Sequence, residues 1–280
     1  MKEPAVVSLD GYQNVQSLPM DGVKDYNKPW KIQASIMVAK LITEAPAAMS
    51  ALKNAVANWN KVFAKQAVYK ESDVVSSPLT QKLGALELNP LFEMMVATDQ
   101  RVQAVKVPAF EAMLDTPKIL GESEFYSNCD FEQGFLASVR LQLSGKTRIM
   151  MIDPTNMIKV MRSKNSSAEL QLSQLRGQLM SLTQSDLATL KAWNAELYFA
   201  ALAPSDLLYV PPGWLVAQST VDGEPASHIK RSFLPVSSLK ASKSILESLN
   251  ESTTMRQGVK DMLGMLLALM GAKVASAAAA

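Results

Sequence analysis

Histidine and cysteine are scarce in this chain of 280 residues, which contains one of each, His228 and Cys129. Zinc fingers, disulfide-bonded scaffolds and sites with two histidine ligands each need more of these residues. Charge of one sign is also lacking, because 28 Lys and Arg residues are balanced by 26 Asp and Glu residues. We therefore expect no nucleic-acid partner, since non-specific nucleic-acid binding needs a strongly cationic surface.

Long apolar runs are lacking as well. The best candidate, Met262 to Ala272, has about half of the ~20 apolar residues that a membrane-spanning helix needs. We expect a helix that packs on the core or on a partner protein, and no membrane partner. Met1 is not followed by a signal-like segment and the cysteine is unpaired, which together indicate an intracellular, cytoplasmic protein.

The hydrophobic pattern divides the chain into four parts. An irregular leader precedes a helical region that begins at Pro29, then come a β domain with a helical insertion and a C-terminal helical segment. Their bounds are 1–28, 29–120, 121–236 with the insertion near 154–196, and 237–280. An apolar stripe within 29–69 is either an internal packing face or a docking surface for a partner helix.

The β domain begins with two strand signals. Residues 135–144 alternate between apolar and polar side chains, which predicts a half-buried strand with Arg140 and Gln142 on the polar face. Gly145 predicts a hairpin turn to a second strand over 147–152. Asp153-Pro154 then ends that strand and opens a helix.

Helix and strand signals alternate further along the chain. Residues 167–196 predict a long helical stretch with Asp186 as an internal cap. Strands are expected over 197–202 and 206–210. A second hairpin is expected between 214–220 and 227–234, because an Asp-Gly turn signal joins these two runs.

Two segments of the β domain resemble one protein family. The stretch ASVRLQLSGKTRIMMIDPTNMIKVM (137–161) resembles the strand, tight turn and strand that follow the metal-binding corner of JmjC-type cupins. The stretch APSDLLYVPPGWLVAQST (203–220) is similar to the segment that delivers the last metal ligand in that family. The resemblance covers roughly 130–234 and implies an α+β fold, with a JmjC-like double-stranded β-helix core between N-terminal and C-terminal helical segments.

The metal ligands of that family are missing from this sequence. Its Fe(II)/2-oxoglutarate oxygenases hold iron with a His-x-Asp/Glu pair and a distant histidine. The first pair would fall within 128–134, which contains no histidine, and the distant position holds Val216. We therefore expect no metal, no cofactor and no catalytic residue, but a non-catalytic binding or structural module. The degenerate pocket would consist of Asp130, Glu132, Thr147, Tyr209, Trp214, Val216 and His228.

Two other functions stay open. As an enzyme, the chain could combine His228 with Asp130 and Glu132 in a rearranged metal site, or with Cys129 as a nucleophile pair. Strand alternation places His228 on one face with Lys230, which predicts a solvent-facing position and counts against the metal site. Cys129 stands between Asn and Asp without the cationic neighbours that lower a thiol pKa, which counts against the nucleophile pair. As an assembly protein, the chain would dock an unidentified protein through 29–69 or 257–280.

Overall fold

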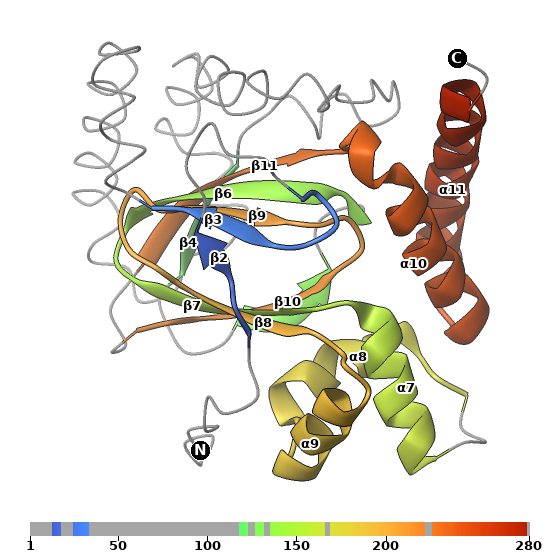
Figure 1. Cartoon of the computed structure of the whole chain (residues 1–280), viewed down its shortest axis with the longest axis horizontal. Coiled ribbons are helices and arrows are strands. Elements are labelled where there is room, and N and C mark those ends of the chain that lie inside the picture. The colour runs from blue at the N-terminus through green and yellow to red at the C-terminus, as the bar shows by residue number, and fades with distance from the viewer. Residues whose placement is uncertain are drawn as a thin grey trace.

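The computed structural model describes residues 13–17, 25–33, 118–122, 127–131, 135–165, 169–221 and 226–278. These residues form a mixed α+β structure with two β-sheets, and the helices gather at one end of the sheets (Figure 1). The helices predicted between residues 34 and 117 lie outside the described part of the chain, and so does most of the apolar stripe within 29–69.

The two sheets contain all the strands of the described residues. Sheet A has the order β1-β8-β7-β10-β5, and sheet B has the order β2-β3-β9-β6-β11-β4. The strands of sheet A are β1 (Gln13–Asn14), β5 (Ser127–Phe131), β7 (Thr147–Ile152), β8 (Leu197–Leu202) and β10 (Leu215–Thr220). Those of sheet B are β2 (Gln16–Ser17), β3 (Trp30–Ile32), β4 (Lys118–Glu122), β6 (Ala137–Ser144), β9 (Leu207–Val210) and β11 (Ala226–Phe233).

The tight turns connect strands of opposite sheets. Gly145, with a φ of +63°, separates β6 from β7, yet β6 pairs with β9 and β11 whereas β7 pairs with β8 and β10. The predicted hairpin between 214–220 and 227–234 is wrong for the same reason, because β10 and β11 belong to different sheets. A turn signal in the sequence specifies a chain reversal, and a crossing between two stacked sheets needs the same reversal.

The N-terminal part of the chain differs from the prediction at two places. Trp30–Ile32 forms β3, which pairs with β9, where a helix was expected to begin at Pro29. Lys118–Glu122 forms β4, which pairs with β11, although helix was expected up to residue 120. Both segments are short, and pairing with a neighbouring strand decides their conformation more than local propensity does.

The leader joins the edges of both sheets. Within 1–28, β1 adds a parallel strand to β8 of sheet A and β2 adds a parallel strand to β3 of sheet B. Val15 lies between β1 and β2, and its side chain is buried in the apolar cluster that the two sheets share. The leader therefore closes one side of the two-sheet stack.

The predicted helical insertion and C-terminal helices are confirmed. They are α7 (Pro154–Lys164), α8 (Leu172–Gln178), α9 (Gln184–Ala192), α10 (Leu239–Ser252) and α11 (Gln257–Ala278). Asp153 caps α7 by accepting the Thr155 N–H at 2.8 Å. The single helical stretch predicted over 167–196 is divided into separate helices. Thr183 is the N-cap of α9 and forms a capping box with Asp186, the third residue of that helix.

The two C-terminal helices pack on each other, and α10 also contacts α7 and lies beside the turn at Gly213, at the end of the sheets (Figure 1). Leu246 and Leu249 of α10 are fully buried, as are Leu263, Leu266 and Met270 of α11. These three side chains of α11 are thus covered by this chain itself. Among the described residues, no helix combines the length and apolar character needed to span a bilayer.

Candidate functional site

The space between the sheets is polar at the end where the Gly145 turn joins β6 to β7. Arg140 and Gln142 of β6 are 5% and 1% exposed, so the prediction of a half-buried strand with a solvent-exposed polar face is wrong. Sheet A covers that face. The Arg140 guanidinium donates to Gln218 on β10, and the Thr147 hydroxyl on β7 donates to the Gln142 side-chain oxygen at 2.9 Å. These bonds join the two sheets through the interior.

His228 lies in this polar interior. It is 2% exposed and pairs in register with Gln142, so the two side chains share a face of sheet B. The solvent-facing position predicted from its alternation with Lys230 is therefore wrong. The same sheet-on-sheet packing that buries Arg140 buries His228, and the sequence gives no local sign of it.

The other end of the interior, beside the helices, is apolar. Val216 is 5% exposed and belongs to a buried cluster with Met151, Tyr198 and Trp214. The rings of Tyr198 and Trp214 have centroids 5.7 Å apart. In sheet A, Val216 pairs with Asp130 on one side and with Met151 on the other. An aliphatic side chain with apolar neighbours cannot coordinate a metal, so the residues at this position do not fit the family's iron.

Strand register separates the candidate ligands. In sheet A, Asp130 lies at the same level as Val216 and Met151. In sheet B, His228 lies at the same level as Gln142. Gln142 bonds across to Thr147, which is four residues from Met151 along β7. Four residues span about 13 Å along a strand, and stacked sheets lie about 10 Å apart. This spacing argues against a metal site shared by these two residues and against a Cys129/His228 pair. Glu132 lies outside the described residues.

In the described chain, no three His, Cys, Asp or Glu side chains converge on a point that could hold a metal ion. Thr147, Trp214, Val216 and His228 do lie between the sheets, but at two different levels. The structure therefore places these four residues at two levels and does not bring them together at one point.

Tyr209 lies on the opposite face of sheet B. Its ring stacks on Trp30 with centroids 5.0 Å apart, and its hydroxyl donates to the carbonyl oxygen of Tyr26 at 2.8 Å. Burial raises the pKa of Tyr209 well above its ordinary value. Tyr209 is therefore part of an aromatic cluster in the core and does not line the predicted pocket.

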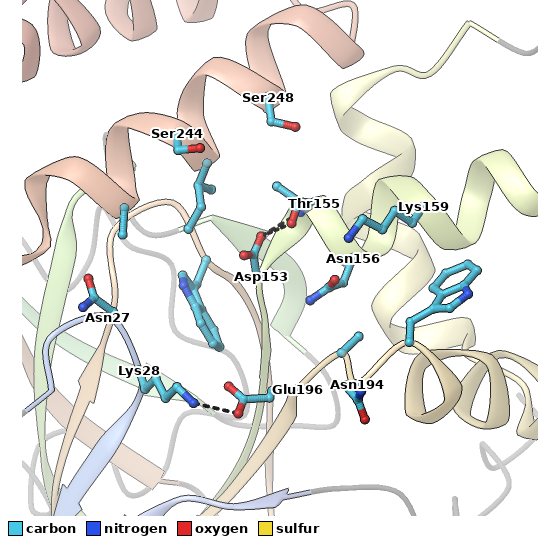
Figure 2. A pocket seen from close by; sticks show the side chains of 15 residues that line it. Asn27, Lys28, Asp153, Thr155, Asn156, Lys159, Asn194, Glu196, Ser244 and Ser248 are labelled. Carbon is cyan, nitrogen blue, oxygen red and sulfur yellow. Dashed lines mark hydrogen bonds and ion pairs between the residues drawn. The ribbon is translucent and has the colours of Figure 1, made fainter.

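An open cleft of about 680 Å³ lies at the helical end of the sheets. Its walls come from the first turn of α7, the residues before β8, one face of α10, the segment at 27–28, and Trp214. Figure 2 shows Ser244 and Ser248 of α10 on one side of this space and Asn194 and Glu196 on the other. A polar cleft of this size is large enough for a small organic ligand.

Two charged groups of the cleft are paired with each other. Lys28 bonds to Glu196 at 2.7 Å, and the Tyr198 hydroxyl donates to the same carboxylate at 2.7 Å (Figure 2 shows the first bond). Burial alone raises the pKa of Glu196, but the hydrogen bonds from Lys28 and Tyr198 outweigh it and hold the pKa below 4.5. Burial and the adjacent carboxylate together raise the pKa of Tyr198.

Sequence reasoning missed every wall of this cleft except Trp214. The wall residues come from five segments that are far apart in the chain, and each segment alone has an ordinary composition. Asp-Pro at 153–154 and Pro-Pro-Gly at 211–213 were the signals nearest to it, because both mark strands that end at this side of the molecule. No protein-family model matches the chain, and a search of the curated proteins finds no match.

Proposed function

We propose that the strands over 118–233 form the double-stranded β-helix of JmjC-type cupins, and that this barrel is a non-catalytic binding module. The strand order supports the fold. β4-β11-β6-β9 stack on β5-β10-β7-β8, and most successive strands change sheet, as in eight-stranded jelly rolls and cupins. The two sequence segments that resemble the family supply β6, β7, β9 and β10 of this arrangement.

The environment of Val216 is the observation that carries the non-catalytic assignment. In the family, a histidine at this position would supply an imidazole to the metal. Here Val216, a side chain without a ligand atom, belongs to a buried apolar cluster with Met151, Tyr198 and Trp214. Introducing a charged ion among these apolar groups would require desolvating it without compensation. Fold and chemistry can separate in this way, because function depends on the site and the fold alone does not specify it.

The second feature that supports the proposal is Thr147, which stands where a basic residue often pairs with 2-oxoglutarate. Its hydroxyl is already bonded to Gln142. A neutral hydroxyl gives a carboxylate much less stabilisation than a cation does. The cosubstrate therefore lacks its partner at this position, in the same way as the metal lacks its ligand.

Metal analysis of the purified full-length protein tests the proposal. We expect less than about 0.1 equivalent of iron, manganese or zinc, and no change in melting temperature on adding 2-oxoglutarate with Mn(II). Stoichiometric metal that Asp130→Ala or His228→Ala removes would overturn the proposal. Gln13→Ala, on the exposed edge strand β1, is the matched control, since it should leave any metal in place.

A further inference from the structure

The wall of the cleft is rich in side chains that both donate and accept hydrogen bonds. Within the described part of the chain, the amides of Asn27, Asn156 and Asn194 and the hydroxyls of Ser244 and Ser248 line the cleft without a hydrogen-bond partner. An amide offers a donor and an acceptor side by side, and a hydroxyl offers both on one atom. Such a wall matches a ligand whose own polar groups also do both.

The charged side chains that line the cleft sum to zero, because Lys28 and Lys159 are balanced by Asp153 and Glu196. Glu196 is bonded to Lys28, and Asp153 accepts from the backbone N–H and the hydroxyl of Thr155 at 2.8 and 2.7 Å. Lys159 lies where the cleft continues into a hollow of about 600 Å³ beside Arg162. The cleft itself therefore favours a neutral, strongly hydrogen-bonding ligand over an anion or a lipid.

Two indole rings supply the apolar part of the site. Trp193, which follows α9, is 41% exposed at the rim, and a large aromatic ring left in water beside a cleft is a ready stacking surface. Trp214 lines the cleft at 4% exposure, and its Nε1–H has no hydrogen-bond partner among the described residues.

We propose that this cleft binds a short neutral oligosaccharide, with Trp193 stacking on a sugar ring and the three asparagines bonding to its hydroxyls. This inference rests on the binding role proposed above. A sugar hydroxyl donates and accepts, as these amides do, and the C–H face of the ring is the apolar surface that an exposed indole can cover. A cleft of about 680 Å³ has room for a ligand of two or three sugar units.

The test is a titration of the full-length protein, kept in a chelator, with a panel of neutral di- and trisaccharides built from glucose, galactose, mannose and N-acetylglucosamine. Indole fluorescence and ligand-observed NMR report binding. We expect at least one sugar to bind, and Trp193→Ala to weaken it about tenfold or more. Asn156→Ala and Asn194→Ala are each expected to weaken it several-fold.

The matched control is Met265→Ala, which removes the other large exposed apolar side chain of the described residues from α11, outside the cleft. It should leave sugar binding unchanged. An unchanged affinity of a folded Trp193→Ala protein would overturn the assignment. The absence of binding by every saccharide of the panel would also overturn it. So would a protein that binds inorganic phosphate or adenosine monophosphate but no saccharide of the panel.

The two proposals fail separately. Sugar binding together with stoichiometric metal would overturn the non-catalytic role and support the assignment of the cleft. A metal-free protein that binds no sugar would overturn the assignment of the cleft and support the non-catalytic role.

Discussion

Replacing Gly213 by alanine is expected to lower the free energy of unfolding by about 2–4 kcal/mol. Gly213 sits in the turn between β9 and β10 with a φ of +75°, a conformation that costs a residue with a Cβ about 1–2 kcal/mol. A Cβ there would lie 2.9 Å from Cδ2 of Leu246 and 3.3 Å from Cγ2 of Ile245 on α10. Carbon atoms normally pack at about 3.5–4.0 Å, so this overlap adds roughly 1–2 kcal/mol.

A double-mutant cycle separates the two contributions. Leu246→Val removes the carbon atom at 2.9 Å and alone should cost about 1–1.5 kcal/mol, for one buried methylene and the small cavity left behind. In that background Gly213→Ala should cost about 1 kcal/mol less than in the native protein, because the backbone strain remains and most of the overlap is gone.

Urea denaturation followed by circular dichroism measures all four proteins of the cycle. Gly264→Ala is the matched control, since it adds the same methyl group inside α11 with no atom within 4 Å. It should stabilise the protein by about 0.5–1 kcal/mol. If the effects of the two single substitutions on the free energy of unfolding add to within about 0.5 kcal/mol of the double variant, the contact between the turn and α10 is refuted. If Gly213→Ala leaves the free energy of unfolding unchanged, the positive φ is refuted.

Two further predictions concern α9 and the leader. Asp186→Ala should cost about 1 kcal/mol at pH 7, because it removes the capping box with Thr183, while the half-exposed Lys164 adds little. Burial raises the pKa of Asp186, but hydrogen bonds from Lys164 and Thr183 outweigh it and hold the pKa below 3.8. The stability that Asp186 contributes is therefore present above the unfolded pKa of ~3.9 and is lost as pH falls through the folded pKa. Urea titrations from pH 7 to pH 2.5 should show the difference between the two proteins shrinking; a constant difference would contradict the capping role. Val15→Asp should lower the free energy of unfolding, measured by urea denaturation, by more than about 2 kcal/mol, because it puts a carboxylate into the cluster between the sheets. Gln13→Asp, on the exposed strand β1, should change it by no more than about 0.5 kcal/mol. Equal effects would contradict the burial of Val15.

Features that depend on neighbouring residues were predictable from the sequence. The strands at 147–152 and 197–202 have the predicted bounds, and Asp153-Pro154 ends one element and caps the next. Strand alternation, turn glycines and helix caps act over a few residues, so they can be read locally.

The choice of sheet partner could not be predicted in this way. A turn at Gly145 fits a hairpin and a crossing between sheets equally well, and this chain makes the crossing. That one difference explains the wrong exposure of Arg140 and His228, because polar faces expected in water are covered by the facing sheet. The cleft could not be predicted from the sequence for a related reason. Its lining residues Asn27, Asn194 and Ser244 come together only after both sheets and α10 have assembled.

The crossing turns also determine when the chain can fold. Ile119 of β4 pairs with Ile229 of β11, and Asp130 of β5 pairs with Val216 of β10. Strands made early in synthesis therefore wait for partners made much later, which raises the contact order and slows folding. A ribosome-bound chain that ends before 226–233 would leave β4 and one edge of β6 unpaired, so arrested nascent chains of that length should be protease-sensitive and bind chaperones.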